Sequence, residues 1–223
     1  MADLIVTIDG PAASGKSTAA RLLAERLGAC FLDTGAMYRA VTLAAMQAGV
    51  DMSDEDELHD VLRRSKFEFS SRGDKMTVAI DGVDVTEEIR RPDVTANARY
   101  IASSAKLRER LVQMQRQFAK NEEKIVTEGR DQGTVAFADA DVKFFLVADA
   151  AERARRRQAE LRANGVDEGL EELQRAIEER DKSDMDREVG PLKPAGDAIV
   201  IDTTELSIEE VVKKLFECAE KNG

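Results

Sequence analysis

The sequence contains no tryptophan, and aromatic residues make up only 4% of its 223 residues. It has one histidine, His59, and two cysteines, Cys30 and Cys218, which lie far apart. A lone histidine excludes a zinc site built on histidine, and thiols without metal-ligand spacing are expected to stay reduced. Long apolar runs are also missing, since none approaches the ~18 residues that a membrane span needs. The composition therefore predicts a globular domain with no membrane partner.

Positive charge is in deficit, with 33 Lys and Arg against 44 Asp and Glu and a net charge of −11. Such an excess of negative charge opposes binding that depends on neutralising phosphates, so no nucleic-acid partner is predicted. The arginines nevertheless gather locally, as in Arg153-Ala154-Arg155-Arg156-Arg157. This clustering favours small anionic ligands, although many of these arginines, Arg155 among them, are expected to lie on solvated helix faces.

A secretory signal is absent from the first residues. Met1-Ala2-Asp3 leads directly into an apolar segment, and no basic stretch precedes it. Together with the two reduced thiols, this start predicts a cytoplasmic protein.

The strongest pattern that is present is Gly10-Pro-Ala-Ala-Ser-Gly-Lys-Ser17, which fits the phosphate-binding template G-x-x-x-x-G-K-[ST]. An apolar strand over 4–8 precedes it and a helix over 16–27 follows it, which is the context that the motif requires. In such a loop backbone N–H groups surround a polyphosphate, the lysine reaches the terminal phosphates, and the serine hydroxyl binds Mg²⁺. The motif alone leaves ATP and GTP open, but the GTP-reading pattern N-K-x-D is absent.

Five short apolar strands alternate with helices along the chain. We expect them over 4–8, 30–32, 125–127, 143–147 and 198–202. This alternation predicts an α/β fold of three layers, with a five-stranded parallel sheet between helices. Ligands of such sheets bind at the carboxyl ends of the strands, which brings Gly10–Ser17, Asp33–Gly35 and Glu128–Asp131 to one edge.

Residues 66–85 follow a different pattern. Phe67–Ser70 and Met76–Ile80 alternate with period two around a turn at Ser71–Asp74, and Val83–Val85 is a candidate third strand. The pattern predicts a small antiparallel three-stranded insertion in the α/β chain.

Three further segments resemble blocks of the bacterial cytidylate kinases, a family of nucleoside monophosphate kinases with the P-loop NTPase fold. They are Asp33-Thr34-Gly35-Ala36-Met37-Tyr38-Arg39, Glu128-Gly129-Arg130-Asp131-Gln132-Gly133-Thr134-Val135 and Arg180-Asp181-Lys182-Ser183-Asp184-Met185-Asp186-Arg187. The resemblance runs from about residue 4 to residue 216. It implies transfer of the γ-phosphoryl group of ATP to CMP or dCMP, with Mg²⁺, by an enzyme that is usually monomeric.

The resemblance also implies three regions within a single domain of residues 1–223. The core would comprise about 1–35, 106–149 and 166–223. Residues of about 36–105 would bind the monophosphate and carry the insertion, and about 150–165 would form a short helical lid.

On the donor side, the resemblance implies that ATP binds to the loop and the residue after it. These residues are Gly10, Pro11, Ala12, Ala13, Ser14, Gly15, Lys16, Ser17 and Thr18. Lys16 would contact the β and γ phosphates, Ser17 would bind Mg²⁺, and Asp33 would hold a metal-bound water. Arg153 and Arg157 of the lid would close over the phosphates. Because phosphoryl transfer depends mainly on alignment and charge neutralisation, Lys16, Asp33, Arg153 and Arg157 are the candidate catalytic residues.

On the acceptor side, hydrogen-bond chemistry accounts for the choice of base. Cytosine presents an N4 amino donor where uracil presents the O4 acceptor, so the Asp131 carboxylate with the Thr34 hydroxyl suits cytosine. Arg108 and Arg187 would donate to the ring acceptors.

The remaining candidate CMP residues surround the phosphate and the sugar. Arg39 and Arg130 would bind the α-phosphate, because planar guanidinium groups bind phosphate bidentately. Arg180 and Asp184 would approach the sugar, and Tyr38 completes the set.

The sequence departs from the family pattern in two places that bear on the acceptor site. Arg99 stands where a serine near the sugar is common, which leaves the preference between ribose and deoxyribose open. Ala105-Lys106 replaces the usual proline before Leu107-Arg108-Glu109.

Other functions remain to be weighed at this point. A kinase that accepts both UMP and CMP, or a kinase of another small acceptor such as shikimate, would share the loop. A nucleotide-dependent switch would be expected to carry N-K-x-D, and a binding module without activity is opposed by the intact Lys16 and Ser17.

Overall fold

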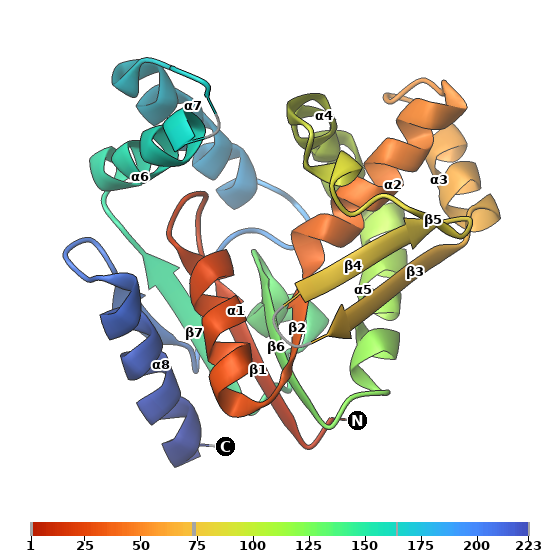
Figure 1. The fold of residues 1–223 in the computed structure, drawn as a ribbon. Helices are drawn as coiled ribbons and strands as arrows, with labels where there is room; N and C mark the ends of the chain where they lie inside the picture. The colour runs from red at the N-terminus through yellow and green to blue at the C-terminus, as the bar shows by residue number, and fades with distance from the viewer. Residues whose placement is uncertain (1, 73–74, 164, 223) are drawn as a thin grey trace.

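The computed structural model describes residues 2–72, 75–163 and 165–222. Its centre is a five-stranded sheet in which neighbouring strands all run parallel, as the sequence predicts (Figure 1). The strands lie in the order β2 (Cys30–Asp33), β6 (Lys124–Gly129), β1 (Leu4–Asp9), β7 (Val142–Val147) and β8 (Ile199–Asp202). The carboxyl ends of β1, β2 and β6 therefore meet at one edge, where Asp33 pairs in register with Glu128, and Asp9 with Gly129.

Helices cover both faces of this sheet. Along β1, Val6 and Ile8 are buried in one cluster with residues of α1 (Lys16–Leu27) and α8 (Ile208–Asn222). Ile5 is buried in a second cluster, with residues of α2 (Thr34–Ala48) and α5 (Ala105–Ala119). A strand that is buried on both faces needs the nearly continuous apolar run that the sequence has here.

The segment between β2 and α5 forms a second structural unit beside the sheet. It comprises α2, α3 (Glu55–Arg64), a three-stranded antiparallel sheet, a short 3-10 helix (Glu88–Arg90) and α4 (Pro92–Ser103). The Asp33 carboxylate accepts a hydrogen bond from the Ala36 N–H at 2.8 Å and so caps α2, which begins at Thr34.

The predicted antiparallel insertion is confirmed, with small differences at its turns. Its strands are β3 (Phe67–Arg72), β4 (Lys75–Ile80) and β5 (Val83–Asp84). The predicted turn is shorter than expected because β3 continues through Ser71 and Arg72, which pair with Met76 and Lys75. The other two residues of that turn, 73 and 74, lie outside the described residues.

A short π-helix follows β6, and two longer helices follow β7. A five-residue π-helix (Gln132–Ala136), which the sequence did not indicate, lies between β6 and β7. After β7 come α6 (Ala150–Ala163) and α7 (Leu170–Met185), which pack against each other, with Ala154, Leu173 and Ile177 buried between them. None of the helices in the described ranges is long and apolar enough to cross a bilayer.

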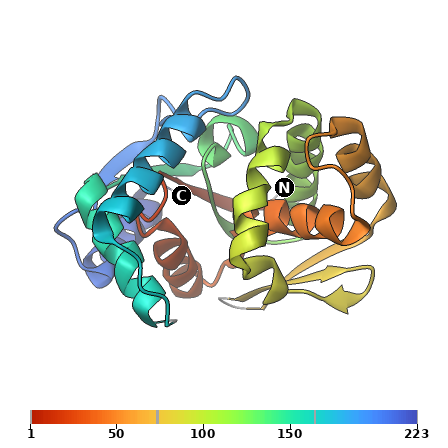
Figure 2. The same ribbon diagram turned by 90° about the horizontal axis from the view of Figure 1, so that it is seen from above.

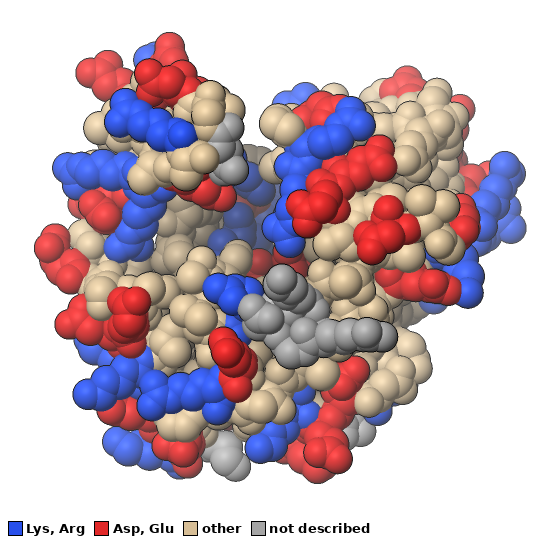
Figure 3. All heavy atoms as spheres, viewed as in Figure 1, with Lys and Arg blue, Asp and Glu red and all other residues tan. Residues whose placement is uncertain are grey.

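Two groups of helices lie on opposite sides of the phosphate loop, Gly10–Ser17. We call α6 and α7 the α6–α7 arm, and α2, α3 and α4 the α2–α4 arm. Seen from above, one arm lies on each side of the loop (Figure 2). The space-filling view shows a hollow between the two arms, with blue Lys and Arg atoms inside it (Figure 3). This cleft opens above the carboxyl ends of the parallel strands, which is where the sequence predicts the site.

Candidate active site

The phosphate loop has the backbone shape that its glycines permit. Gly10 has φ +157°, and a Cβ atom there would collide with the Leu146 carbonyl oxygen of β7. Ala13 and Gly15 adopt positive φ angles of 57° and 84° before α1 begins at Lys16. The first turn of α1 contains no acidic residue and has no side-chain cap, so its free N–H groups face the loop. This arrangement is a ready anion-binding concavity.

Lys16 is buried beside this concavity, with 6% of its surface exposed. Its ammonium donates a hydrogen bond to the Pro11 carbonyl oxygen of its own loop at 3.0 Å. Burial and the nearby Arg130 lower the pKa of Lys16 to about 7, although Glu128 opposes the shift. A phosphate group would supply the negative charge that this amine lacks.

Oxygen atoms suited to a hard cation lie next to Lys16. The Ser17 hydroxyl donates to a Glu128 carboxylate oxygen at 2.8 Å, and burial raises the pKa of Glu128. Asp33 lies close enough to raise that pKa further. In the described ranges no three His, Cys, Asp or Glu side chains form a metal-binding group. The donor set therefore fits Mg²⁺, which keeps several waters and takes its other ligands from substrate phosphates, better than a metal held by the protein alone.

A buried ion pair lies beyond the carboxyl end of β6, the neighbour of β1 in the sheet. Arg108 of α5 contacts Asp131, which follows β6, and their side chains are only 4% and 6% exposed. Burial raises the pKa of Asp131, and the Arg108 charge opposes that shift. The Arg108 guanidinium also lies 5.8 Å from the centre of the Tyr38 ring. Gly190 packs so closely that a Cβ atom would collide with both members of the pair.

A second group of charges centres on Asp184 of α7. Arg130 and Arg187 hold its two carboxylate oxygens at 2.8 and 2.6 Å. Although burial opposes the change, these arginines lower the pKa of Asp184. Arg180 is exposed at the cleft, yet partial desolvation by the cleft walls and the Arg130 charge lower its pKa. This group joins the α6–α7 arm to the end of β6.

Residues at the end of β2 face the same space. Arg39 pairs with Asp33 at 3.0 Å, and the Thr34 hydroxyl donates to the Glu128 carbonyl oxygen at 2.7 Å. Arg99, by contrast, lies over the ring of Tyr100 on α4, at 5.0 Å from its centre, and donates to its hydroxyl.

The two candidate arginines of α6 have different surroundings. Arg153 is buried, pairs with Asp181 of α7 at 2.6 Å and donates to the Ala12 carbonyl oxygen of the loop at 3.0 Å. Arg157 is half-buried and pairs with Glu160 of its own helix at 2.8 Å. Arg155 is exposed, as the sequence predicts.

The sequence did not single out several residues that the structure brings to this edge. Asp9, Asp181 and Gly190 contact the candidate residues or the segments that carry them, and Glu128 bonds to Ser17. A signal was present for Asp9, because a carboxylate that directly follows a buried strand and precedes the loop must lie at the sheet edge. No pattern indicated Gly190, since its closeness to Arg108 arises from segments far apart in the chain.

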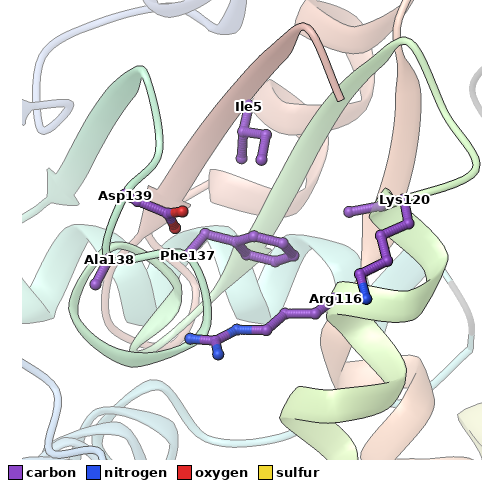
Figure 4. Close-up of a pocket in the computed structure, with 7 residues that line it drawn as sticks. Ile5, Arg116, Lys120, Phe137, Ala138 and Asp139 are labelled. Atoms are coloured by element: carbon purple, nitrogen blue, oxygen red, sulfur yellow. The ribbon is translucent and has the colours of Figure 1, made fainter. Parts of the chain in front are cut away.

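Two pockets of the described surface lie away from this cleft. One, of about 410 Å³, is lined by Ile5, Phe137 and Ala138 with the charged Arg116, Lys120 and Asp139 (Figure 4). The other, of about 440 Å³, lies by α3 and includes Val50, Val61 and Arg64. Neither of these two pockets is lined by a candidate residue.

Comparison with known proteins gives a consistent result. The family model described as cytidylate kinase matches residues 6–221. A cytidylate kinase of Limosilactobacillus reuteri (strain DSM 20016) is 47% identical over 219 residues, 98% of this chain and 96% of that protein. A cytidylate kinase of Bacillus pumilus (strain SAFR-032) is 46% identical over 218 residues, with 98% and 96% covered. Among solved structures, TT1252 from Thermus thermophilus has a TM-score of 0.51 at 17% identity, over 99% of this chain and 98% of that chain, which reflects a shared fold.

Proposed function

The chain belongs to the cytidylate kinase family, and from this membership we propose how its residues share the work of the reaction. The enzyme is a nucleoside monophosphate kinase with the P-loop NTPase fold. It transfers the γ-phosphoryl group of ATP to CMP or dCMP and releases ADP with CDP or dCDP. The observation that carries the assignment of roles is the buried Arg108–Asp131 pair, whose carboxylate lies two residues after β6, the strand that pairs with β1 where β1 enters the phosphate loop.

The loop from Gly10 to Thr18 would bind the ATP phosphates. Its free N–H groups and the start of α1 provide the donors. Lys16 would exchange the Pro11 carbonyl oxygen for the β and γ phosphates, where its positive charge stabilises the transferring group. Since its present acceptor is a neutral carbonyl oxygen, the exchange sacrifices no ion pair.

Mg²⁺ would be held by the Ser17 hydroxyl and the substrate phosphates, and it would offset negative charge on the oxygens between donor and acceptor. Asp33 would orient a water in its shell. Ser17 now donates to Glu128, so its hydroxyl already points toward the carboxylates at this edge.

The Asp131 carboxylate would read the base by accepting a hydrogen bond from N4 of cytosine, with the Thr34 hydroxyl beside it. Uracil would present O4 to the same carboxylate, and two acceptors facing each other in a buried site are unfavourable. Arg108 and Arg187 would donate to the ring acceptors, and Tyr38 would form the wall behind Arg108.

The phosphate and sugar of CMP would lie nearer the loop. Arg39 and Arg130 would bind the α-phosphate after releasing Asp33 and Asp184. Arg180 and Asp184 would approach the sugar, where Asp184 carries a charge stabilised by its arginine neighbours.

Closure of the lid would complete the site. We assign the lid to about 150–165, the monophosphate region to about 36–105 and the core to the rest of the chain. Arg153 already contacts the loop, and Arg157 would turn from Glu160 toward the ATP phosphates on closure. Catalysis would then depend on alignment, neutralisation by Lys16 and these arginines, and exclusion of water.

Both halves of the site come from one chain, so the enzyme would act as a monomer with its two nucleotides as its only partners. We place it in the cytoplasm, because within the described residues neither Cys30 nor Cys218 forms a disulfide and reduced thiols are usual there.

The test is an assay coupled to ADP release, with CMP, dCMP, UMP and AMP as acceptors. We expect CMP and dCMP to be phosphorylated far better than UMP or AMP. Asp131→Asn should reduce the CMP preference over UMP by about tenfold or more, because an amide can donate to O4. Asp139→Asn, a charge change of the same kind at the far pocket, should leave the preference unchanged. A best rate with UMP or AMP would refute the proposed role of Asp131.

A further inference from the structure

We propose that Asp9 is a positioning residue, whose carboxylate fixes the segment that presents Arg130 and Asp131 to CMP relative to the phosphate loop. The inference rests on the roles proposed above for these two residues. It goes beyond them because Asp9 itself would touch neither nucleotide.

Asp9 is the last residue of β1, and both of its carboxylate oxygens are used. One accepts the Gln132 N–H and the other the Gly133 N–H, each at 2.8 Å. These N–H groups belong to the first turn of the π-helix, where no acceptor exists within the helix itself. Asp131, which precedes the helix, provides no side-chain cap, so the cap comes from another strand of the sheet.

Asp9 is attached to the chain on both sides of Arg130 and Asp131. In the sheet, Asp9 pairs in register with Gly129, the last residue of β6. The chain then passes through Arg130 and Asp131 and returns to Asp9 at Gln132 and Gly133. The two substrate-facing residues therefore lie between two attachments to the same amino acid. A displacement of either attachment would move both side chains.

The other end of the π-helix is held by a charge of opposite sign. Arg116 of α5 donates to the carbonyl oxygens of Val135 and Ala136, at 3.0 and 2.7 Å. Its side chain passes beneath Phe137 toward the loop at Ala138 (Figure 4). An anion at the amino end and a cation at the carboxyl end both match the dipole of the helix. The helix is therefore fixed at both ends by charged side chains from outside it.

Asp9 also connects this segment to the donor site. The next residue is Gly10, whose backbone packs so tightly against Leu146 that no side chain would fit. The backbone on the donor side of Asp9 consequently has little freedom to move. The Asp9 carboxylate therefore links Arg130 and Asp131 to the phosphate loop through one residue whose backbone is held in place.

The desolvation cost of burying the Asp9 carboxylate also indicates that this side chain does more than fill space in the core. Asp9 is only 3% exposed, and burial raises its pKa to about 7 despite the two N–H donors. A core that needed only volume would be served better by an apolar side chain, because burying a carboxylate carries a large desolvation cost.

The test is Asp9→Asn, which keeps the size of the side chain but turns one acceptor into an amide donor facing an N–H. We expect KM for CMP to rise about tenfold or more, KM for ATP to change less than about twofold, and the CMP preference over UMP to fall. Thr7→Val is the matched control. Thr7 lies on the same strand, its hydroxyl lies close to Gly133, and among the described residues that hydroxyl has no hydrogen-bond partner. This control should leave all three quantities within about twofold.

The outcomes separate this inference from the proposed function. If Asp131→Asn reduces the CMP preference and Asp9→Asn does not, Asp9 has no positioning role. If Asp131→Asn itself has no effect, the proposed reading of cytosine fails instead. A purely structural role of Asp9 would raise KM for both nucleotides together and would also overturn the inference.

Should Asp9→Asn fail to fold, Arg116→Gln at the other end of the π-helix decides the question. Its exposed position makes folding of the variant safe. A rise of about threefold or more in KM for CMP, with KM for ATP unchanged, supports the positioning of this segment. An unchanged KM for CMP contradicts it.

Discussion

Lys16 shows how burial can prepare one residue for an anionic ligand. It is buried, its nearest acceptor is a neutral carbonyl oxygen, and its pKa lies at about 7 instead of 10.5. Above pH 7 the unfolded chain therefore holds a proton that the folded protein has released. The contribution of Lys16 to stability accordingly rises with pH between about 7 and 10.5.

The same shift predicts that ATP binding takes up a proton. At pH 8 Lys16 should be mostly neutral in the free protein, and triphosphate beside it should raise its pKa again. We expect an uptake of about one proton per site, measured by calorimetry in two buffers with different enthalpies of ionisation.

Lys16→Met should abolish most of this uptake, whereas Lys120→Met, at the distant pocket, should leave it intact. ATP binding to the unaltered protein at pH 8 without any proton uptake would show that Lys16 is charged in the empty site.

Gly190 sets a steric limit on the Arg108–Asp131 pair, to which we assign the reading of the base. It has φ +61° and lies against both Arg108 and Asp131. Gly190→Ala should cost about 1–2 kcal/mol through left-handed backbone strain. It should also raise KM for CMP about tenfold, because the methyl group displaces the pair. Steady-state kinetics and urea denaturation measure the two effects.

Gly165→Ala is the matched control, because Gly165 has φ +78° but open space around it. It should show similar backbone strain with KM for CMP unchanged. Equal KM values in the two variants would mean that the pair does not need the space that Gly190 leaves.

At the scale of helices and strands, the sequence predicts those elements whose apolar residues recur with a clear period. The strands of the main sheet, the antiparallel hairpin and helix α1 all follow from alternation, apolar runs and spacing. The π-helix could not be found in this way, because five residues are too few to establish a period. It exists because Asp9 and Arg116 satisfy its ends, and these contacts join segments more than 100 and about 20 residues apart.

The proposed lid, about residues 150–165, has the features of a segment that moves. The cluster of buried residues that it shares with α7 is small, and its link to the loop runs through Arg153. We predict that an analogue joining adenosine and cytidine through a chain of phosphates slows hydrogen exchange in residues 150–165. The reason is that Arg157 and its neighbours become ordered over the phosphates.

Helix α8 is the internal reference for this measurement, since it packs on the face of the sheet away from the α2–α4 arm. Its exchange should not change. Exchange in 150–165 that is the same with and without the analogue would exclude closure of this segment.

At the scale of the whole molecule, the order of the motifs along the chain predicts which residues lie at the same edge of the sheet. It does not predict which side chains form ion pairs there. Because the strands are parallel, the loop, Asp33–Arg39 and Glu128–Asp131 had to reach one edge of the sheet. Which carboxylate each arginine would hold depends on α5 and α7 arriving from distant parts of the chain. For this reason the pairs Arg108–Asp131 and Arg153–Asp181 became visible only in the folded structure.

These internal pairs also affect how an acidic protein treats the salts around it. Arg39, Arg108, Arg130 and Arg187 each hold a carboxylate in the structure. A free phosphate or sulfate ion would have to displace a partner that is already tethered at high local concentration. A nucleotide brings a base, a sugar and a phosphate at once, so it would displace several partners together. These internal pairs would therefore favour a nucleotide over the simple anions of its surroundings.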